Sequence, residues 1–216
     1  MTGGAIALAG CAKKQAAGPS SYLFVANREG RAVAAVDLGV FTLAKRIALE
    51  ADPAQVVAHP RRRLVYALSP ADGVLTEISA TKLAVTRRMT LAAGADWMRW
   101  SHDGALLWVR AGDQLLGVDV SAFQVSRRIK LPGVATGLDL SPETPDGVAS
   151  FAASGELLVL DLAAGKIART VKIGAEAGAV RLLKNGSWIV AGRPDERLLT
   201  LIDTASGRLV VELPLA

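Results

Sequence analysis

The sequence has little of what metal and redox sites are built from, with one cysteine and two histidines among 216 residues. A single cysteine cannot form a disulfide within the chain, and two histidines without a cysteine or carboxylate cluster do not make a zinc site. Nucleophile elbows, zinc-protease helices and phosphate-binding glycine loops are also absent. We therefore predict no metal, no cofactor and no catalytic residue of these classes.

Long apolar runs and an excess of acidic residues are missing as well. No apolar run approaches the ~18 residues that a transmembrane helix needs, and the formal net charge is +5. Hydrophobic residues make up 51% of the chain and charged residues only 21%. This balance predicts a folded chain, and its length suits one domain or one repeat array.

The only cysteine lies in the stretch GAIALAGCAKKQ, where small and apolar residues precede Cys11 and two lysines follow it. This stretch resembles a bacterial lipobox, which implies cleavage before Cys11 and lipid on its thiol. Two acyl chains give stable membrane anchoring where one is marginal. We predict a lipoprotein signal remnant and tether over residues 1–20, and a periplasmic or surface location in the cell envelope. The alternative is an unmodified cysteine in a tail, because the apolar run is short and no basic residue precedes it.

One pattern recurs through residues 21–216: an apolar run, a polar turn, and a second apolar run that ends on Asp or Ser. The copies are YLFVANREGRAVAAVDL, RLVYALSPADGVLTEIS, LLWVRAGDQLLGVDV, VASFAASGELLVLDL and WIVAGRPDERLLTLID. An aromatic position aligns as Phe24, Tyr66, Trp108, Phe151 and, without an aromatic, Val190, at spacings of 42, 42, 43 and 39. The second run ends at Asp37, Ser79, Asp119, Asp161 and Asp203, at spacings of 42, 40, 42 and 42. Two markers that share one period predict a repeat protein.

Each period holds four short apolar runs of strand length, without helical periodicity. The dipeptides Asp103-Gly104, Asp146-Gly147 and Asn185-Gly186 are expected to separate the first run from the second, since they favour tight hairpin turns. Four antiparallel strands per repeat are typical of a β-propeller blade. We predict an all-β propeller of about five four-stranded blades over residues 21–216, the first of which lacks its inner strand.

The copies resemble the YVTN-type repeat of bacterial surface and periplasmic proteins, in the YVTN/cytochrome-d1-like propeller superfamily. Phe24-Val25-Ala26-Asn27 matches the naming motif, and Ile202-Asp203-Thr204 followed by Gly207-Arg208 matches the end of the third strand. The resemblance implies the fold and says little about function. It also implies rings of about seven blades, so an incomplete seven-bladed ring and a five-bladed or open form are both considered.

One position on the predicted inner strands breaks their apolar pattern. The strands read QVVAHP, MRWSHD, LDLSPE and VRLLKN, and this alignment places Val56, Arg99, Asp139 and Arg181 in register. Inner strands line the central tunnel of a propeller. We therefore predict that Arg99, Asp139 and Arg181 bind a small anionic ligand or a partner side chain. Trp97 and Trp100 would form an apolar wall beside them. The alternative is an ion pair that holds neighbouring blades together.

The other recurrent side chains are interpreted as structural. His59 and His102 are expected at equivalent turn positions, the strand-ending aspartates are expected to cap turns, and the aromatic residues to pack between blades. A belt of basic residues is expected on the outer strands: Lys45, Arg46, Arg87, Arg88, Arg127, Arg128 and Arg169. Such a belt protects strand edges, or contacts anionic lipid if Cys11 is acylated.

These patterns predict a non-catalytic binding or interaction scaffold of the envelope, whose partner is an unknown protein or a small anionic ligand. Nucleic acid is not an expected partner of an exported protein. The alternative is a propeller enzyme or enzyme-associated subunit that acts at the tunnel. Propeller lactonases, which resemble this architecture, hold a metal with Glu, Asp and Asn, and haem- and quinone-associated oxidoreductases share the repeat. Asp139 and Asp96 are the inner-strand carboxylates that such a site could use.

Overall fold

The computed structural model describes residues 21–174, 177–183 and 186–215. In this part of the chain every regular element is a β-strand, and the strands form five antiparallel sheets, numbered here as blades 1 to 5. Blade 1 holds β1 (Tyr22–Asn27), β2 (Ala32–Asp37) and β3 (Thr42–Ala48). Blade 2 holds β4 (Gln55–Ala58), β5 (Leu64–Ser69), β6 (Val74–Ser79) and β7 (Ala84–Thr90).

Blades 3 to 5 repeat the four-stranded pattern. They hold β8 (Ala95–Trp100), β9 (Leu106–Ala111), β10 (Gln114–Asp119) and β11 (Gln124–Lys130); β12 (Gly137–Leu140), β13 (Asp146–Phe151), β14 (Glu156–Asp161) and β15 (Lys166–Lys172); and β16 (Val180–Leu183), β17 (Trp188–Arg193), β18 (Leu198–Asp203) and β19 (Leu209–Pro214). Among the described residues, no strand pairs with the inner edge of β1. The predicted all-β propeller of five units, with three strands in the first, is therefore confirmed.

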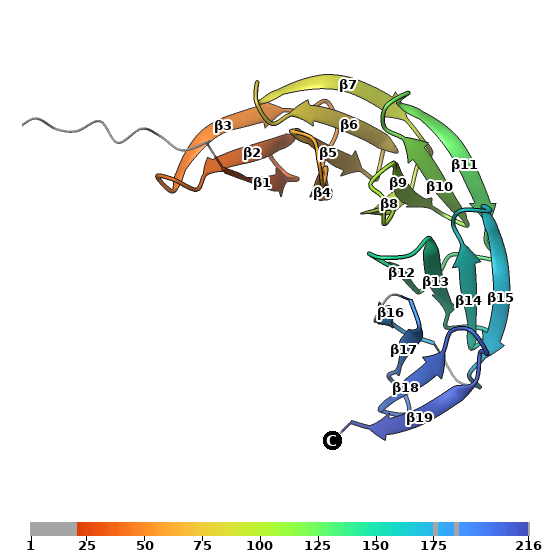
Figure 1. Cartoon of the computed structure of the whole chain (residues 1–216). Coiled ribbons are helices and arrows are strands. Elements are labelled where there is room, and N and C mark those ends of the chain that lie inside the picture. The colour runs from red at the N-terminus through yellow and green to blue at the C-terminus, as the bar shows by residue number, and fades with distance from the viewer. Residues whose placement is uncertain (1–20, 175–176, 184–185, 216) are drawn as a thin grey trace, which may run out of the picture.

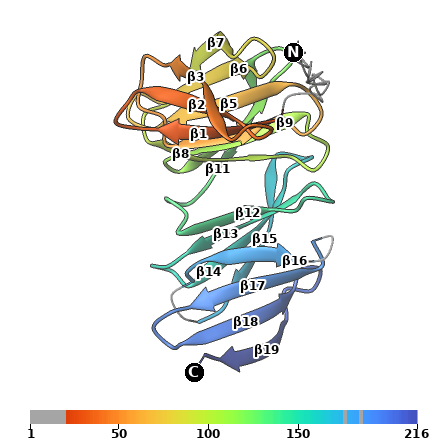
Figure 2. The same ribbon diagram turned by 90° about the vertical axis from the view of Figure 1, so that its left-hand side faces the viewer.

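The blades stand side by side along an open arc (Figure 1). The inner strands β4, β8, β12 and β16 lie on its concave side, and the long outer strands β7, β11 and β15 follow its convex side. A view into the open side shows β8, β12 and β16 of successive blades one below another (Figure 2). Residues that occupy the same place in different blades are thus brought to one level of the concave face.

The hydrophobic core lies between the blades. Strands of each blade have apolar residues on both faces, so both faces pack against a neighbour. One cluster joins Tyr66 and Leu75 of blade 2 to Met98 and Leu107 of blade 3. Equivalent clusters join the other neighbouring pairs of blades. The expectation that the aromatic residues pack between blades is confirmed for Tyr66 and Trp108, which are fully buried.

The two terminal blades leave apolar faces exposed. Leu23 and Val25 of β1 are 51% and 44% exposed. Their counterparts Leu107 and Val109 in β9 are fully buried, because blade 2 covers them. Every residue of β19 at the other end of the arc is exposed. Unpaired edges and apolar faces of this kind favour association with other chains.

The strand pairing corrects two details of the sequence alignment. Residues Asp146 and Gly147 do not form a turn but begin β13, where Asp146 pairs with Asp161. As a result, Val148 and not Phe151 occupies the position of Tyr66 and Trp108. Phe151 lies near the end of the strand and is still buried between blades 3 and 4. The aromatic pattern misled the alignment because the β9–β10 connection of blade 3 has two residues where the other blades have four, so that Val148 follows Trp108 by 40 positions.

Each third strand ends on a residue that caps the following turn, as predicted. The carboxylates of Asp37, Asp119, Asp161 and Asp203 accept hydrogen bonds from backbone N–H groups two or three residues later, and Ser79 does the same through its hydroxyl. Four residues after this cap the backbone is left-handed in every blade, at Phe41, Leu83, Phe123, Gly165 and Gly207, with φ between 49° and 72°. The turn therefore favours glycine at a position where three blades have a side chain.

We expect Phe41→Gly to raise the free energy of unfolding by about 1 kcal/mol, because Phe41 has a φ of 54° and is 80% exposed. Little packing is lost at such a site, while the backbone strain is relieved. The matched control is Gly165→Ala, whose new Cβ meets no atom within 4 Å but inherits a φ of 68°. The free energy of unfolding measured by denaturant titration should rise for Phe41→Gly and fall for Gly165→Ala. A change in the same direction for both variants would contradict the role of backbone strain at this turn.

Candidate functional site

The concave face carries charged side chains at one level of the inner strands. Pairing with the second strand aligns Val57, Arg99, Asp139 and Arg181, which lie opposite Tyr66, Trp108, Val148 and Val190. The predicted register is confirmed for the three charged residues, whereas the residue in blade 2 is Val57 rather than Val56. An error of one residue matters here because neighbouring side chains of a strand point to opposite faces.

Arg99 and Asp139 meet across the interface between blades 3 and 4. The guanidinium of Arg99 donates to Oδ1 of Asp139, and the two side chains form an ion pair. Oδ2 of Asp139 accepts the backbone N–H of Leu182 in blade 5 at 2.9 Å. The Arg99 side chain is 44% exposed while that of Asp139 is 3% exposed. One buried carboxylate therefore connects three consecutive blades.

Arg181 lies at the same level on β16, the inner strand of blade 5, and is exposed. Its guanidinium donates to the carbonyl oxygen of its neighbour Val180 at 2.8 Å. No ion pair of Arg181 is present among the described residues. At this register two cations thus accompany one carboxylate, and the positive charge of Arg181 faces solvent.

The two tryptophans of β8 are not adjacent parts of one wall. Trp100 lies against blade 2, where its Nε1 donates to the carbonyl oxygen of Ala58 at 2.7 Å and its ring stacks at 4.7 Å on His59. Trp97 packs on the other side, against the cluster that blades 3 and 4 share. Since Trp100 is three positions after Trp97 on the same strand, the two side chains point to opposite faces. Both side chains contribute mainly to the blade interfaces.

Two polar contacts of the inner strands were not anticipated from the sequence. The side-chain amide of Gln55 in β4 bonds to both backbone groups of Met98 in β8, at 2.8 and 3.0 Å. Asp96 forms a two-point ion pair with Arg110, at 2.8 Å for each contact. Gln55 lies two positions before Val57 and is the polar residue of an otherwise apolar strand, a signal that could have marked it as a link between blades. Both inner-strand carboxylates of blades 3 and 4 are therefore engaged by arginines.

The histidines have the turn roles that were expected but not equivalent positions. His59 aligns with Ser101 and Ser141, and its Nδ1 accepts the backbone N–H groups of Arg61 and Arg62 at 3.0 and 3.2 Å. Burial, together with the charges of Arg62 and Arg61, lowers the pKa of His59. A neutral imidazole is what these two hydrogen bonds require. His102 is one position further along its loop and is exposed.

The belt of basic residues on the outer strands splits into two groups. Arg87 and Arg127 point toward the following blade. Arg87 donates to the carbonyl oxygens of Val120 and Ser121, and Arg127 to those of Leu162 and Ala163. A β-bulge precedes these arginines in both blades and sets their direction. The others are exposed, and of these Arg88 pairs with Glu50 at 2.9 Å.

A buried carboxylate completes the contact of Arg87. Glu77 is 3% exposed and accepts hydrogen bonds from Tyr66 Oη, Thr86 Oγ1 and Arg87 Nε at 2.8, 2.7 and 2.9 Å. Burial favours the protonated form of Glu77, but the hydrogen bonds from Arg87, Thr86 and Tyr66 outweigh it and lower the pKa of Glu77. The Arg87 guanidinium also stacks at 4.4 Å over Phe123 of blade 3. This network joins blades 2 and 3.

Within the described ranges, no group of three or more histidine, cysteine, aspartate or glutamate side chains could hold a metal ion. The same ranges contain no helix long and apolar enough to cross a membrane. Cys11 and the predicted tether, residues 1–20, lie outside the described residues.

Known proteins resemble this chain in fold. A chain of hydrazine synthase from Kuenenia stuttgartiensis superposes with a TM-score of 0.73 at 17% identity, over 90% of this chain and 63% of its own. The dihydro-heme d1 dehydrogenase NirN, in complex with DHE, superposes with a TM-score of 0.76 at 19% identity, over 94% of this chain and 46% of its own. No family model and no curated protein matches the sequence.

These likenesses establish the β-propeller fold. The chain spans less than two thirds of either solved chain. At identities below 20% the comparison shows a shared fold, and a fold of this kind hosts many functions. The function must therefore be argued from the residues of the concave face.

Proposed function

We propose that the chain is a binding module of the bacterial cell envelope, in which the concave face holds an anionic group of a small molecule or a partner protein. The observation that carries this proposal is the charge at one register of the inner strands. Arg99 is paired with Asp139, whereas the exposed Arg181 has the carbonyl oxygen of Val180 as its acceptor. A guanidinium has five N–H donors in a planar fork, which suits a carboxylate or a phosphate.

A non-catalytic role is favoured by the state of the inner-strand carboxylates. Asp139 is held by Arg99 and by the N–H of Leu182, and Asp96 is held at two points by Arg110. A metal at either carboxylate would have to displace a guanidinium and leave a positive charge beside the ion. Because such an exchange is costly in a partly buried site, these residues fit a scaffold better than a hydrolase.

The envelope location rests on the lipobox resemblance at Cys11. With acyl chains on Cys11, the arc would be held at a membrane surface, and the exposed outer-strand bases such as Arg128 would lie within reach of anionic headgroups. The intact mass of the protein extracted from its native membranes tests this part of the proposal. A mass without acyl chains would contradict it and would leave the concave-face binding to be judged separately.

Binding at the concave face is tested by calorimetric titration of the full chain with citrate and with inorganic phosphate at low ionic strength. We expect saturable binding of one of them, at least tenfold weaker in Arg181→Ala because Arg181 is the cation of this register that has no ion pair among the described residues. The matched control is Arg128→Ala on the convex side, which should bind as the parent does. Equal affinity of Arg181→Ala and parent, or no saturable binding by the parent, would contradict the proposal.

The second candidate is a propeller subunit of an oxidoreductase. It is favoured by the two structural neighbours, which are a hydrazine synthase and a dihydro-heme d1 dehydrogenase. This candidate requires a bound haem or quinone, or a partner that carries one. Absorption spectra and metal content of protein purified from its native source distinguish the two candidates. A cofactor present in stoichiometric amount would contradict the scaffold proposal and support this second candidate.

A further inference from the structure

Successive blades differ in the side chains that their second and third strands bring together at one aligned position. On the second strand the aligned residues are Tyr66, Trp108 and Val148, and on the third strand they are Glu77, Gly117 and Val159. Between blades 2 and 3 the hydroxyl of Tyr66 donates to Glu77. Between blades 3 and 4 the acceptor is missing because Gly117 has no side chain. A Cβ at Gly117 would lie only 3.2 Å from the indole ring of Trp108.

The indole of Trp108 faces Gly117 with its Cη2 and Cζ3 atoms, and its Nε1–H, on another edge of the ring system, is an unused donor. Its side chain is fully buried, and its Nε1–H has no hydrogen-bond acceptor among the described residues. Such a group costs about 1–3 kcal/mol when it stays unpaired. Two other polar side chains that line the pocket have partners, since Arg127 donates to Leu162 and Ala163 and Ser101 donates to Asp103. Among the described residues of this lining, Trp108 Nε1–H is the buried polar group that lacks a partner.

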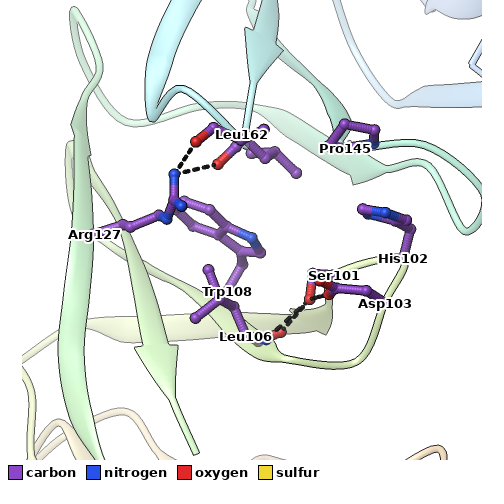
Figure 3. A pocket seen from close by; sticks show the side chains of 9 residues that line it. Ser101, His102, Asp103, Leu106, Trp108, Arg127, Pro145 and Leu162 are labelled. Carbon is purple, nitrogen blue, oxygen red and sulfur yellow. Dashed lines mark hydrogen bonds between the residues drawn. The ribbon is translucent and has the colours of Figure 1, made fainter.

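A pocket of about 130 Å³ lies against this indole, between blades 3 and 4. Figure 3 shows Trp108 on one side of the pocket, with Pro145 and Leu162 of blade 4 above it and the loop of Ser101, His102 and Asp103 opposite. Leu106 and Ala163 add to its apolar lining. The pocket thus combines a buried donor, apolar walls and a polar entrance.

The side of the pocket formed by the loop of Ser101, His102 and Asp103 has a negative charge at neutral pH, whereas the guanidinium of Arg127 lies on the side of Leu162 and donates to the carbonyl oxygens of Leu162 and Ala163. The carboxylate of Asp103 accepts the hydroxyl of Ser101 at 2.6 Å and the N–H of Ala105 at 3.0 Å. These two hydrogen bonds, the one from Ser101 foremost, lower the pKa of Asp103. A ligand that reaches the indole past Asp103 is therefore favoured if it is neutral and if it can donate a hydrogen bond to the carboxylate.

We propose that this pocket is a binding site for a small neutral molecule of the carboxamide or alcohol class. Its acceptor oxygen pairs with Trp108 Nε1–H, its apolar part fills the space between Leu106 and Leu162, and its donor faces Asp103. The volume equals that of roughly four water molecules at ~30 Å³ each, which fits a compound the size of acetamide. The site is separate from the concave face and does not rest on the function proposed for it.

The test is a titration of the ¹⁵N-labelled full chain with acetamide, followed through the indole N–H resonances of its tryptophans. The Trp108 resonance is identified by its loss in Trp108→Phe. We expect it alone to shift in a saturable manner, while Trp97, Trp100 and Trp188 stay unchanged. Acetate, which has the same shape and a negative charge, should bind at least tenfold more weakly.

Asp103→Asn removes the charge at the entrance and keeps its shape. In this variant the difference between acetate and acetamide should shrink several-fold. If Trp108→Phe fails to fold, the Asp103→Asn comparison still decides, because the selectivity change requires the ligand to lie beside Asp103. A Trp108 resonance that does not respond to acetamide at 100-fold excess over protein would mean that only water fills the pocket, which overturns the proposal.

Discussion

Replacing Glu77 by alanine is expected to lower the free energy of unfolding by about 3–5 kcal/mol. The carboxylate is 3% exposed and holds Tyr66, Thr86 and Arg87 in place. Its loss leaves the phenol of Tyr66 without its acceptor and Arg87 without its counter-ion. Arg87 in turn contacts the turn after β10 in blade 3. Equilibrium denaturation of the purified chain measures the effect.

A control for this prediction copies the equivalent position of the next blade interface. Between blades 3 and 4 the same place holds Trp108 and Gly117. The double variant Tyr66→Trp, Glu77→Gly copies that arrangement, and it should be less destabilised than Glu77→Ala because the indole occupies the space of the carboxylate. A double variant that loses as much stability as the single one would show that the two interfaces are not interchangeable.

The same carboxylate makes stability depend on pH. The pKa of Glu77 is lowered in the folded chain, so the folded state binds fewer protons at this group than the unfolded state. Its stabilisation is fully present above the unfolded pKa of about 4.3 and is lost as the pH falls through the folded pKa. In Glu77→Gln the loss of stability below that pH should therefore be less steep than in the parent. If stability fell equally steeply with pH in Glu77→Gln and in the parent, Glu77 would not be a source of the pH dependence.

Replacing Asp139 by alanine is expected to cost about 2–3 kcal/mol of stability. The buried backbone N–H of Leu182 loses its acceptor, and Arg99 loses its counter-ion. Arg99 itself is 44% exposed, so water compensates for part of its loss. Thermal and denaturant unfolding of the variant, compared with the parent, measure the difference.

Two arginine variants complete this prediction. Arg99→Ala should also be destabilising, because it leaves the buried carboxylate of Asp139 without its counter-ion and with the N–H of Leu182 as its remaining donor. Arg181→Ala should unfold like the parent, since its side chain is exposed and bonds only to a neighbouring carbonyl. If Arg181→Ala were as unstable as Asp139→Ala, the distinction between a structural pair and an exposed binding cation would not hold.

Much of the candidate site could be found from sequence because it follows the repeat. Arg99, Asp139 and Arg181 stand out since the other inner-strand positions are mostly apolar, and the strand pairing confirms their common level. Their ligand-binding role stays a prediction. Trp97 and Trp100 were placed together because they lie on one strand, but an interval of three residues puts them on opposite faces. Val56 was misaligned because His59 aligns with Ser101 and not with His102. Phe151 was misaligned because the β9–β10 connection is two residues shorter than its counterparts.

The sequence by itself determined the number of blades, their strand order and the turn that caps each third strand. These features depend on local periodicity and on residues a few positions apart, so each copy of the pattern supports the others. Only the tertiary structure decided which polar groups meet between blades. Gln55 bonds to Met98, Asp139 connects Arg99 to Leu182, and Trp108 is left beside a pocket where blade 2 has a carboxylate. Such contacts join residues about forty positions apart, and their geometry follows from how two twisted sheets pack rather than from either segment alone.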